Sequence, residues 1–324
     1  MDALSDVLRV ARLSGGVFFH AEFFEPWSIA AQLTPEHCAG YLGSATHMIP
    51  YHYVVEGRFR IRVEGEAPFE LAPGEIVLFP RNDMHFMGSN LDLPAVPASS
   101  VIAQPPGGGF GAIRLGGSGD RAQVICGYLA CGSVNDNPLI STLPRVLHLN
   151  VAEAGAAEWI RSTFQYAADE LTAGRPGSET VLAKLSELLF VEAIRRYVDA
   201  LPSKQTGWLA GLRDPHVARV LALFHGNVAR SWTVDELGRE VGLSRSALAD
   251  RFTRLIGQAP MHYLTHWRMH VAANDLRNTS ASLTQVAQNV GYDSEAAFSR
   301  AFKKAFGAAP ATWRRQGVQH EPTR

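Results

Sequence analysis

The chain is poor in the features that would place it outside ordinary globular proteins. It has only 3 cysteines in 324 residues, and a small odd number does not make a disulfide scaffold. No apolar run approaches the ~20 residues that cross a bilayer, and the residues after Met1 lack the charged-then-apolar pattern of a secretion signal. A hydrophobic fraction of 46% excludes wholesale disorder. We expect a cytoplasmic protein without a membrane partner, and the length predicts two domains better than one.

The formal net charge of −1 hides an asymmetry along the chain. Residues 214–315 hold 13 Lys and Arg against 8 Asp and Glu, a balance of +5, which leaves −6 for the remainder. A basic last third on an acidic body indicates an anionic partner for that third alone.

Residues 1–132 are predicted to form many short strands without intervening helices, which indicates a β-sandwich or small barrel. Residues 58–63 alternate polar and apolar, and residues 75–79 form an apolar run that ends at Pro80. The glycine-rich residues 116–120 predict a hairpin between strands at 112–115 and 123–129. Residues 91–109 are rich in Pro, Ser and Gly and are expected to form a loop.

Residues 151–200 change to helical periodicity, interrupted at 174–177, and Ser178 is a candidate N-cap for the second helix. That helix carries an apolar stripe of Val181, Leu182, Leu185, Leu188, Leu189 and Ile194. The stripe either packs on the barrel or pairs with another subunit, and the sequence leaves both open. Residues 201–211 are expected to be a linker.

An internal duplication between residues 214 and 315 is the most informative pattern in the sequence. Each copy has a short helix, a tight turn opened by glycine and a second helix begun by serine: Gly242 with Ser244, and Gly291 with Ser294. The glycines suit a left-handed helix end and the serines suit N-caps. A helix from about 261 to 277 joins the copies, and Asp214-Pro215, Thr233-x-x-Glu236 and Ser282-x-x-Gln285 are further helix-start signals.

Two helix-turn-helix units on one connecting helix favour double-stranded DNA as the partner, because each second helix could enter a major groove. Cations lie at exposed positions of both second helices: Arg245, Arg251, Arg254, Arg300, Lys303 and Lys304. The alternative is a pair of helical hairpins packed for stability alone, with the cations as a solvated face. A protein-interaction module without a role on DNA is a further alternative.

The duplicated region resembles the DNA-binding domain of the AraC/XylS family of bacterial transcription regulators. The matching residues are Leu237, Val241-Gly242-Leu243-Ser244, Arg251-Phe252, Pro260 and Tyr263, followed by Val286-Ala287, Val290-Gly291-Tyr292-Asp293-Ser294, Phe298-Ser299-Arg300-Ala301-Phe302-Lys303 and Pro310. By that resemblance the base-facing positions are Arg245, Ser246, Ala249 and Asp250 in the first copy, and Glu295, Ala296, Ser299 and Arg300 in the second. Asp250 would repel phosphate, so specificity is expected to depend more on Arg245 and on the second copy.

A second group of chemistry-bearing residues lies in the β-rich part. His52 and Glu56 are four residues apart and would share a face of a strand, and His85 could approach from a neighbouring strand. Two histidines and a carboxylate can bind a divalent metal such as Zn, Fe, Mn or Ni. The pattern resembles the paired motifs of cupin barrels, although Pro50 stands where a first histidine is expected and Asn82 where a glycine is usual. A metal-free pocket or structural set is the alternative. His47 could substitute as a ligand, but its odd offset from His52 places it on the other strand face, which favours a surface or loop histidine.

The expected architecture is therefore α+β and multidomain: a cupin-like barrel at 1–150, a helical hairpin and linker at 151–211, and an AraC-type double helix-turn-helix domain at 212–316. The favoured function is a DNA-binding transcription regulator, not an enzyme, whose barrel senses a small molecule, metal or oxidant. The family resemblance further implies a homodimer, an activator and contact with RNA polymerase. The competing function is a metal-dependent cupin dioxygenase or isomerase using His52, Glu56 and His85. Cys38, Cys126 and Cys131 are expected to be small buried residues rather than a redox pair.

Overall fold

The computed structural model describes residues 2–11, 13–33, 47–103, 112–131, 139–151, 157–173, 175–202 and 204–318. The chain divides into two compact units. We call Leu13–Val134 with Leu143–Tyr197 the β unit, and Met1–Arg12 with Asn135–Thr142 and Val198–Arg324 the helical unit. This division differs from the expected one at the N-terminus and at residues 135–142, both of which group with the helical unit.

The β unit contains a 7-stranded sheet of order β12-β6-β3-β11-β1-β10-β9 and a 5-stranded sheet of order β5-β4-β7-β2-β8. The first sheet is formed by β1 (Ser14–Phe24), β3 (His47–Glu56), β6 (Glu75–Leu78), β9 (Ile102–Ala103), β10 (Ala112–Gly116), β11 (Arg121–Cys131) and β12 (Leu147–Asn150). The second is formed by β2 (Ser28–Ala31), β4 (Phe59–Val63), β5 (Phe69–Leu71), β7 (His85–Gly88) and β8 (Val96–Pro97). The short elements β8, η1 (Ala98–Ser100) and β9 lie where only a loop was expected.

The predicted hairpin between β10 and β11 is wrong, because β1 lies between these two strands. β1 pairs in parallel with β10 and antiparallel with β11. The glycine-rich turn instead wraps the end of β1: Gly117 N donates to Phe24 O at 2.9 Å, and Gly119 N donates to Glu25 O at 2.9 Å. A side chain at Gly116, whose φ is +117°, would overlap the Phe24 carbonyl, so this turn requires glycine for close approach.

Apolar side chains from both sheets fill the interior of the β unit, as the alternation in β4 predicts. Phe23 stacks on Trp27 with ring centroids 4.0 Å apart, and both are buried together with Phe59, Ile61 and Tyr128. Burial of this apolar surface is the main term that stabilises the unit.

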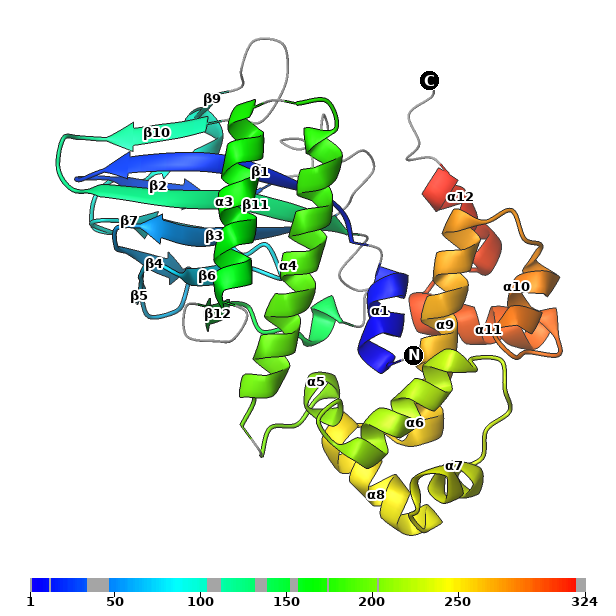
Figure 1. The fold of residues 1–324 in the computed structure, drawn as a ribbon. Helices are drawn as coiled ribbons and strands as arrows, with labels where there is room; N and C mark the ends of the chain where they lie inside the picture. The colour runs from blue at the N-terminus through cyan, green and yellow to red at the C-terminus, as the bar shows by residue number, and fades with distance from the viewer. Residues whose placement is uncertain are drawn as a thin grey trace. The chain divides into compact units, whose positions relative to one another are not determined.

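Two helices, α3 (Ala157–Ala173) and α4 (Ser178–Ala200), cover one face of the larger sheet (Figure 1). Tyr53 of β3 stacks on Phe164 of α3 at 4.0 Å, and the Tyr51 hydroxyl lies 3.2 Å from the Ser186 hydroxyl of α4. The apolar stripe therefore packs within the chain, although Leu188 is 49% exposed and does not join it. Ser178 is not a simple N-cap, because its buried hydroxyl donates to Glu170 Oε1 at 2.6 Å.

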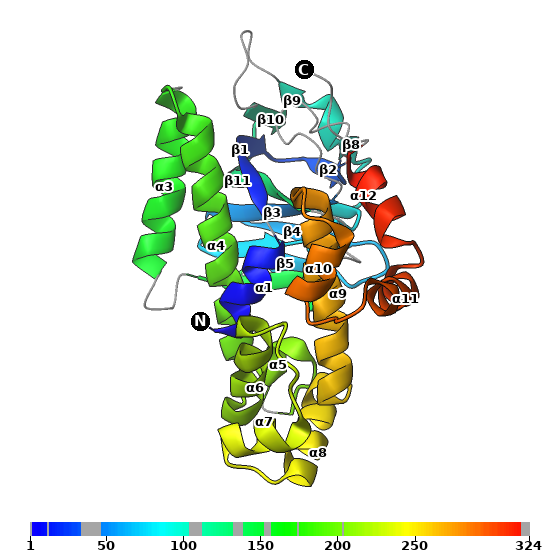
Figure 2. The same cartoon turned by 90° about the vertical axis from the view of Figure 1, so that its right-hand side faces the viewer.

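The helical unit consists of short helices around one long helix, α9. Its elements are α1 (Ala3–Ala11), η3 (Ile140–Thr142), α5 (Trp208–Gly211), α6 (Pro215–Gly226), α7 (Val234–Val241), α8 (Arg245–Ile256), α9 (Pro260–Asn278), α10 (Leu283–Asn289), α11 (Glu295–Phe306) and α12 (Pro310–Val318). Figure 2 shows α9 running from the pair α7–α8 to the pair α10–α11. The described part of the chain has no helix that is both long and apolar enough to cross a membrane.

The N-terminal helix α1 packs on α6 of the helical unit, where Ala3 and Val7 are buried. The His225 ring donates from Nδ1 to the Ala3 carbonyl at 3.3 Å and accepts at Nε2 from the Tyr263 hydroxyl at 2.8 Å. Trp208 Nε1 donates to the same hydroxyl at 2.8 Å. Burial lowers the pKa of His225 to about 3, so the ring is neutral in this network. Because Trp208 belongs to α5 and is buried, the expected linker at 201–211 is partly a packed helix.

Candidate nucleic-acid interface and sensor site

The first helix-turn-helix unit forms as its cap residues predict. The Thr233 hydroxyl accepts from Glu236 N at 3.2 Å while the Glu236 carboxylate accepts from Thr233 N at 2.8 Å, a complete capping box. Gly242 ends α7 in the left-handed conformation with φ +71°, and the Ser244 hydroxyl accepts from Ala247 N at 3.3 Å to begin α8. These caps fix the turn between the two helices and hence the direction in which α8 points.

The second unit repeats this construction with one difference. Gly291 has φ +79°, and the Ser294 hydroxyl accepts from Ala297 N at 3.4 Å to begin α11. Ser282 caps α10 by accepting from Gln285 N at 3.1 Å, but the Gln285 side chain donates to Asn289 instead of returning to Ser282. The predicted second capping box is therefore only half formed.

Both second helices are held by a buried apolar side and leave the opposite side in solvent. Leu248 and Phe252 of α8, and Phe298 and Phe302 of α11, are fully buried. Exposure follows the expected pattern at the positions predicted to face DNA: Arg245, Ser246, Asp250, Glu295, Ala296, Arg300, Lys303 and Lys304 are exposed, and Ala249, Arg251 and Ser299 are half-buried. The first turns of α8 and α11 are therefore accessible in the helical unit.

Several of these side chains already have intramolecular partners, including Ser246, whose hydroxyl lies 3.4 Å from that of Ser244. Arg251 donates from Nε to Asp214 Oδ2 at 2.8 Å, and its Nη2 lies 2.6 Å from the same oxygen. Asp214 is also the N-cap of α6, so this ion pair joins α8 to α6. Burial acts to raise the pKa of Asp214, but hydrogen bonds, chiefly the one from Arg251, lower it by more, so the pKa is lowered overall. Arg245 pairs with Asp235 at 3.2 Å across the surface, and Thr284 donates to Glu295 at 2.7 Å. Surface pairs of this kind are weak and can exchange for a phosphate or a base.

In the β unit the structure brings His52 and His85 together between the two sheets. Their Nε2 atoms are 2.9 Å apart, and both side chains are buried. His85 Nδ1 donates to the Asp83 carbonyl at 3.0 Å, so its Nε2 must accept from His52 Nε2–H. His52 Nδ1 is then left to accept from the Cys126 thiol, whose Sγ lies 3.0 Å away. The result is one chain of neutral hydrogen bonds that links β11, β3 and β7.

Burial keeps every member of this chain uncharged. It lowers the pKa of His52 well below the usual value, lowers that of His85 to about 4 and raises that of the Cys126 thiol. Cys126 is the partner that the sequence did not identify. It lies directly opposite His52 in the antiparallel register of β3 and β11, a pairing between residues far apart in the chain.

Glu56 does not join the two histidines. The register of β3 against β11 shifts between Val54 and Glu56, which is a bulge at Val55, and the bulge turns Glu56 to the opposite strand face. Its side chain is 56% exposed and lies 3.8 Å from Arg121. Even in a strand without a bulge, residues 52 and 56 would be about 13 Å apart, so two side chains on the same strand face at this spacing are not in contact.

This arrangement does not fit a metal ion. The two Nε2 atoms that would ligate it already share a proton, and Glu56, the expected carboxylate ligand, lies on the opposite strand face. His47 does not replace Glu56, because its Nε2 lies 2.7 Å from the Pro80 carbonyl. Cys131 is a buried free thiol, and Cys38 lies outside the described residues.

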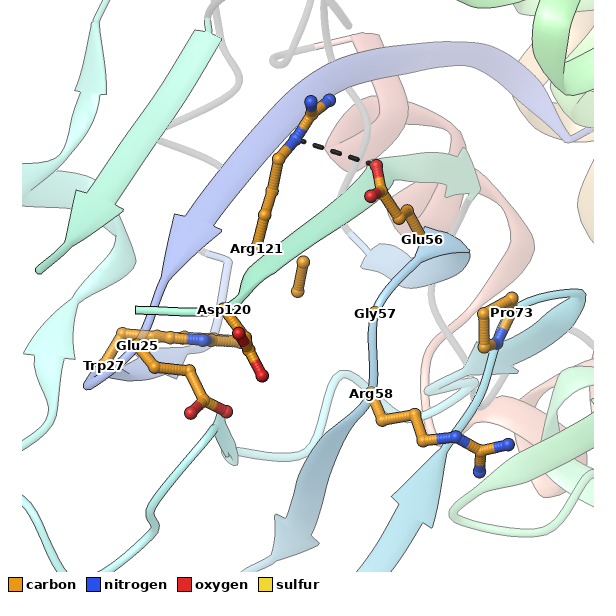
Figure 3. Close-up of a pocket in the computed structure, with 9 residues that line it drawn as sticks. Glu25, Trp27, Glu56, Gly57, Arg58, Pro73, Asp120 and Arg121 are labelled. Carbon is orange, nitrogen blue, oxygen red and sulfur yellow. Dashed lines mark ion pairs between the residues drawn. The ribbon is translucent and has the colours of Figure 1, made fainter. Parts of the chain in front are cut away.

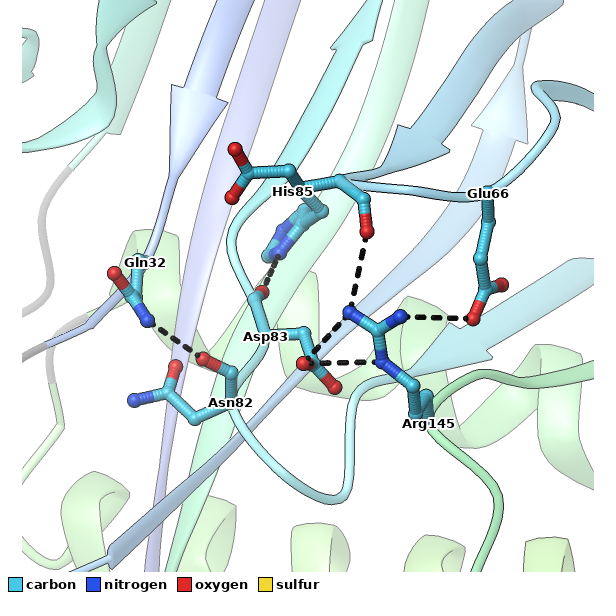
Figure 4. Close-up of polar contacts among 7 residues, drawn as sticks. Gln32, Glu66, Asn82, Asp83, His85 and Arg145 are labelled. Atoms are coloured by element: carbon cyan, nitrogen blue, oxygen red, sulfur yellow. Dashed lines mark hydrogen bonds and ion pairs between the residues drawn. The ribbon is translucent and has the colours of Figure 1, made fainter.

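The turn that precedes His85 is fixed by polar contacts on both sides (Figure 4). Asn82 has φ +55°, which explains why this position suits asparagine or glycine, and its side chain accepts from Leu33 N at 3.2 Å. Arg145 donates to Asp83 Oδ1 at 2.9 Å and to Glu66 at 3.3 Å. These contacts hold the Asp83 carbonyl where it accepts from His85.

A cavity of about 560 Å³ opens in the β unit at the end of β3 (Figure 3). Its lining residues are Glu25, Trp27, Glu56, Gly57, Arg58, Pro73, Asp120, Arg121 and Ala122. Arg58 pairs with Glu70 at 2.9 Å, and Arg121 pairs with Glu22 at 3.2 Å. Within the described residues no ion pair engages Glu25 or Asp120, both of which are labelled on the cavity wall in Figure 3. Sequence reasoning missed this cavity because its walls come from segments far apart in the chain.

A β-sandwich joined to a duplicated helix-turn-helix defines a DNA-binding transcription regulator with a cupin-type domain. A cupin family model matches residues 2–199, and a helix-turn-helix domain model matches residues 237–316. The chain is 35% identical to an AraC-like transcription regulator of Streptomyces lividans over 84% of its own length and 88% of the relative. It is 34% identical to another of Streptomyces antibioticus, over 97% of this chain and 99% of the relative.

The chain belongs to the AraC-like transcription regulators. This confirms the predicted α+β architecture and the predicted class, a regulator rather than an enzyme. Among solved structures, the DNA-binding domain of AdpA in complex with a target DNA is 28% identical, covers 34% of this chain and 99% of that chain, and has a TM-score of 0.32.

Proposed function

We propose that this regulator reads its operator with the first two turns of α8 and α11, and that the β unit senses a small polar effector. The observation that carries the first part is that the N-terminal halves of two helices capped in the same way carry exposed arginines, Arg245 in the first turn of α8 and Arg300 in the second turn of α11. Arginine can grip the O6 and N7 atoms of guanine with two hydrogen bonds, which is the commonest specific contact in the major groove. The remaining base-facing positions are Ser246, Ala249, Asp250, Glu295, Ala296 and Ser299.

Lys303 and Lys304 lie in the last turn of α11 and are exposed, so we assign them to phosphates rather than bases. Arg251 is assigned to neither, because its guanidinium is committed to Asp214. For the domains we keep the expected assignment: a cupin-like sensor near 1–150, a helical hairpin near 151–211 and the DNA-binding domain near 212–316. A regulator of this kind acts on chromosomal DNA in the cytoplasm. We keep a homodimer, activation and contact with RNA polymerase as expectations from the family.

The cavity near Glu56 is our candidate effector site. Its lining is polar and carries both charge signs, which favours a polar ligand over an alkyl chain. It adjoins the end of β3, the strand that also carries His52. A ligand here regulates DNA binding only if it binds two states of the protein with different affinity.

The test is a selection of bound duplexes from a random pool by the full chain, repeated with Arg300→Ala. We expect the variant to lose about 1–3 kcal/mol at one base position and to relax the preference there, while binding to other positions keeps its order. Arg195→Ala is the matched control, since Arg195 is an exposed arginine of α4 in the β unit. An unchanged selected sequence for Arg300→Ala would contradict the assignment of α11 as a reading helix.

A further inference from the structure

The long helix α9 carries a row of histidines that DNA reading does not use. His262, His266 and His270 follow one another at intervals of four residues, which places them on one side of the helix in successive turns. The first two rings are in contact, with centroids 4.3 Å apart and planes inclined by 57°. Two histidines at this spacing on a helix are the arrangement that ligates zinc in helical metalloprotease motifs.

The hydrogen bond of His262 leaves its Nε2 atom available to bind a metal ion. Its Nδ1 lies 2.9 Å from Gln258 Oε1, and an amide oxygen only accepts, so Nδ1 carries the proton. The lone pair is then on Nε2. Histidine ligands of metals usually donate their other N–H to such a carbonyl, which fixes the ring and increases the basicity of the ligating nitrogen.

His266 is also suited to bind a cation. Partial burial lowers the pKa of His266, and His262 and Lys304 lower it further, which favours the neutral ring that binds a metal. His266 lines a cavity of about 280 Å³ together with Gln258 and His270, whereas His262 is exposed to solvent and is not part of that lining. Water ligands for an ion between His262 and His266 therefore come from the solvent side of the helix. His270 differs from the other two, because it is half-buried and its ring packs edge-on against Phe306 at 5.6 Å.

We propose that His262 and His266 form a two-histidine site on α9 for a late first-row divalent metal ion, Zn²⁺, Ni²⁺ or Cu²⁺. Imidazole nitrogen is a preferred ligand of these ions, and water completes the coordination. The bound ion joins two successive turns of the helix that connects both helix-turn-helix units. This site is separate from the His52–His85 pair of the β unit.

The charges around the site predict how its affinity can be changed. Lys304 is the cation that acts on His266 from α11, and it opposes a bound divalent ion. Its replacement by an uncharged residue should therefore tighten metal binding. Within the part of the chain that the structure describes, these two histidines belong to no group of three or more metal-binding side chains, so an affinity weaker than that of a structural zinc site is expected.

The experiment is calorimetric titration of the metal-free full chain with Zn²⁺ alone. We expect His262→Ala and His266→Ala each to weaken one Zn²⁺-binding event at least about tenfold. Either substitution leaves a single histidine ligand, and the gain in affinity from binding the ion with two ligands of the same helix is lost. Lys304→Gln should strengthen the same event about threefold, the size of a surface charge interaction. Both histidines are exposed, so the alanine variants should stay folded, as circular dichroism will verify.

His270→Ala is the control from the same row, and it should keep the affinity of the wild-type chain. The proposal is overturned if the wild-type chain binds no Zn²⁺ at millimolar concentration, or if the double variant of His262 and His266 binds it with unchanged stoichiometry and affinity. Loss of the event in His270→Ala but not in His262→Ala would also overturn it.

Discussion

Gly291 and Gly242 occupy equivalent positions in the two helix-turn-helix units, yet substitution by alanine should affect them very differently. Both have positive φ, +79° and +71°, so alanine costs each about 1–2 kcal/mol in the left-handed conformation. A Cβ at Gly242 would meet nothing within 4 Å. A Cβ at Gly291 would lie 2.4 Å from the Ala229 carbonyl oxygen and 2.8 Å from Arg268 Nη2.

The contact with the Ala229 carbonyl oxygen determines the magnitude, because this backbone atom cannot move aside as the end of a flexible side chain can. Arg268 donates to the carbonyls of Val228 at 2.9 Å, Ala229 at 3.3 Å and Arg230 at 2.9 Å, and so fixes the segment that Gly291 touches. An added methyl group must displace this segment, and loss of one charge-assisted hydrogen bond costs about 1.5–3 kcal/mol. We therefore expect about 3–5 kcal/mol for Gly291→Ala against about 1–2 kcal/mol for Gly242→Ala.

Hydrogen exchange with mass spectrometry on the full chain measures both effects locally. Peptides from α10 and α11 should exchange more than about 100-fold faster in Gly291→Ala, since 1.4 kcal/mol corresponds to a factor of ten. Peptides from α7 and α8 in Gly242→Ala should change by about 30-fold or less. Equal effects in the two variants would refute the argument from close approach.

Two further predictions concern charge. The pKa of His85 is about 4 in the folded protein and about 6.5 in the unfolded chain. Between these pH values only the unfolded state takes up a proton. The free energy of unfolding of the β unit is therefore at its full value above pH 6.5 and falls by up to about 3 kcal/mol toward pH 4. Thermal melts across this range measure the loss, and a constant midpoint would speak against a buried neutral pair. Arg251→Ala should destabilise the helical unit, because it leaves the Asp214 carboxylate without its cation, but should leave the selected DNA sequence unchanged. Urea denaturation and the same selection test this against Arg254→Ala, an exposed neighbour expected to change stability by less than about 0.5 kcal/mol.

The helical unit could be predicted from sequence more completely than the β unit because its signals are local. A cap such as Thr233 and a helix-ending glycine such as Gly242 act within a few residues of themselves, and the structure has both where they were expected. Strand pairing depends on residues far apart, which is why the insertion of β1 between β10 and β11 was not foreseen. Similarly, a single bulge at Val55 removed Glu56 from the expected histidine set.

The candidate DNA-facing positions were predictable because helical periodicity alone determines which side of α8 and α11 is buried. The ion pair between Arg251 and Asp214 was not predictable, since the two residues are 37 positions apart in the chain. The same limit applies to the cavity beside Glu56, whose walls meet only in the folded sheets.

The packing of α1 on α6 has a practical consequence for anyone who prepares the DNA-binding part alone. A fragment begun near residue 212 would lack Ala3, Val7 and Trp208, which are buried in this unit. Truncation would expose the apolar surface they cover and remove the acceptor of His225. Such a fragment is a poor reference for the intact protein, and a better one would retain residues 2–11 through an engineered connection.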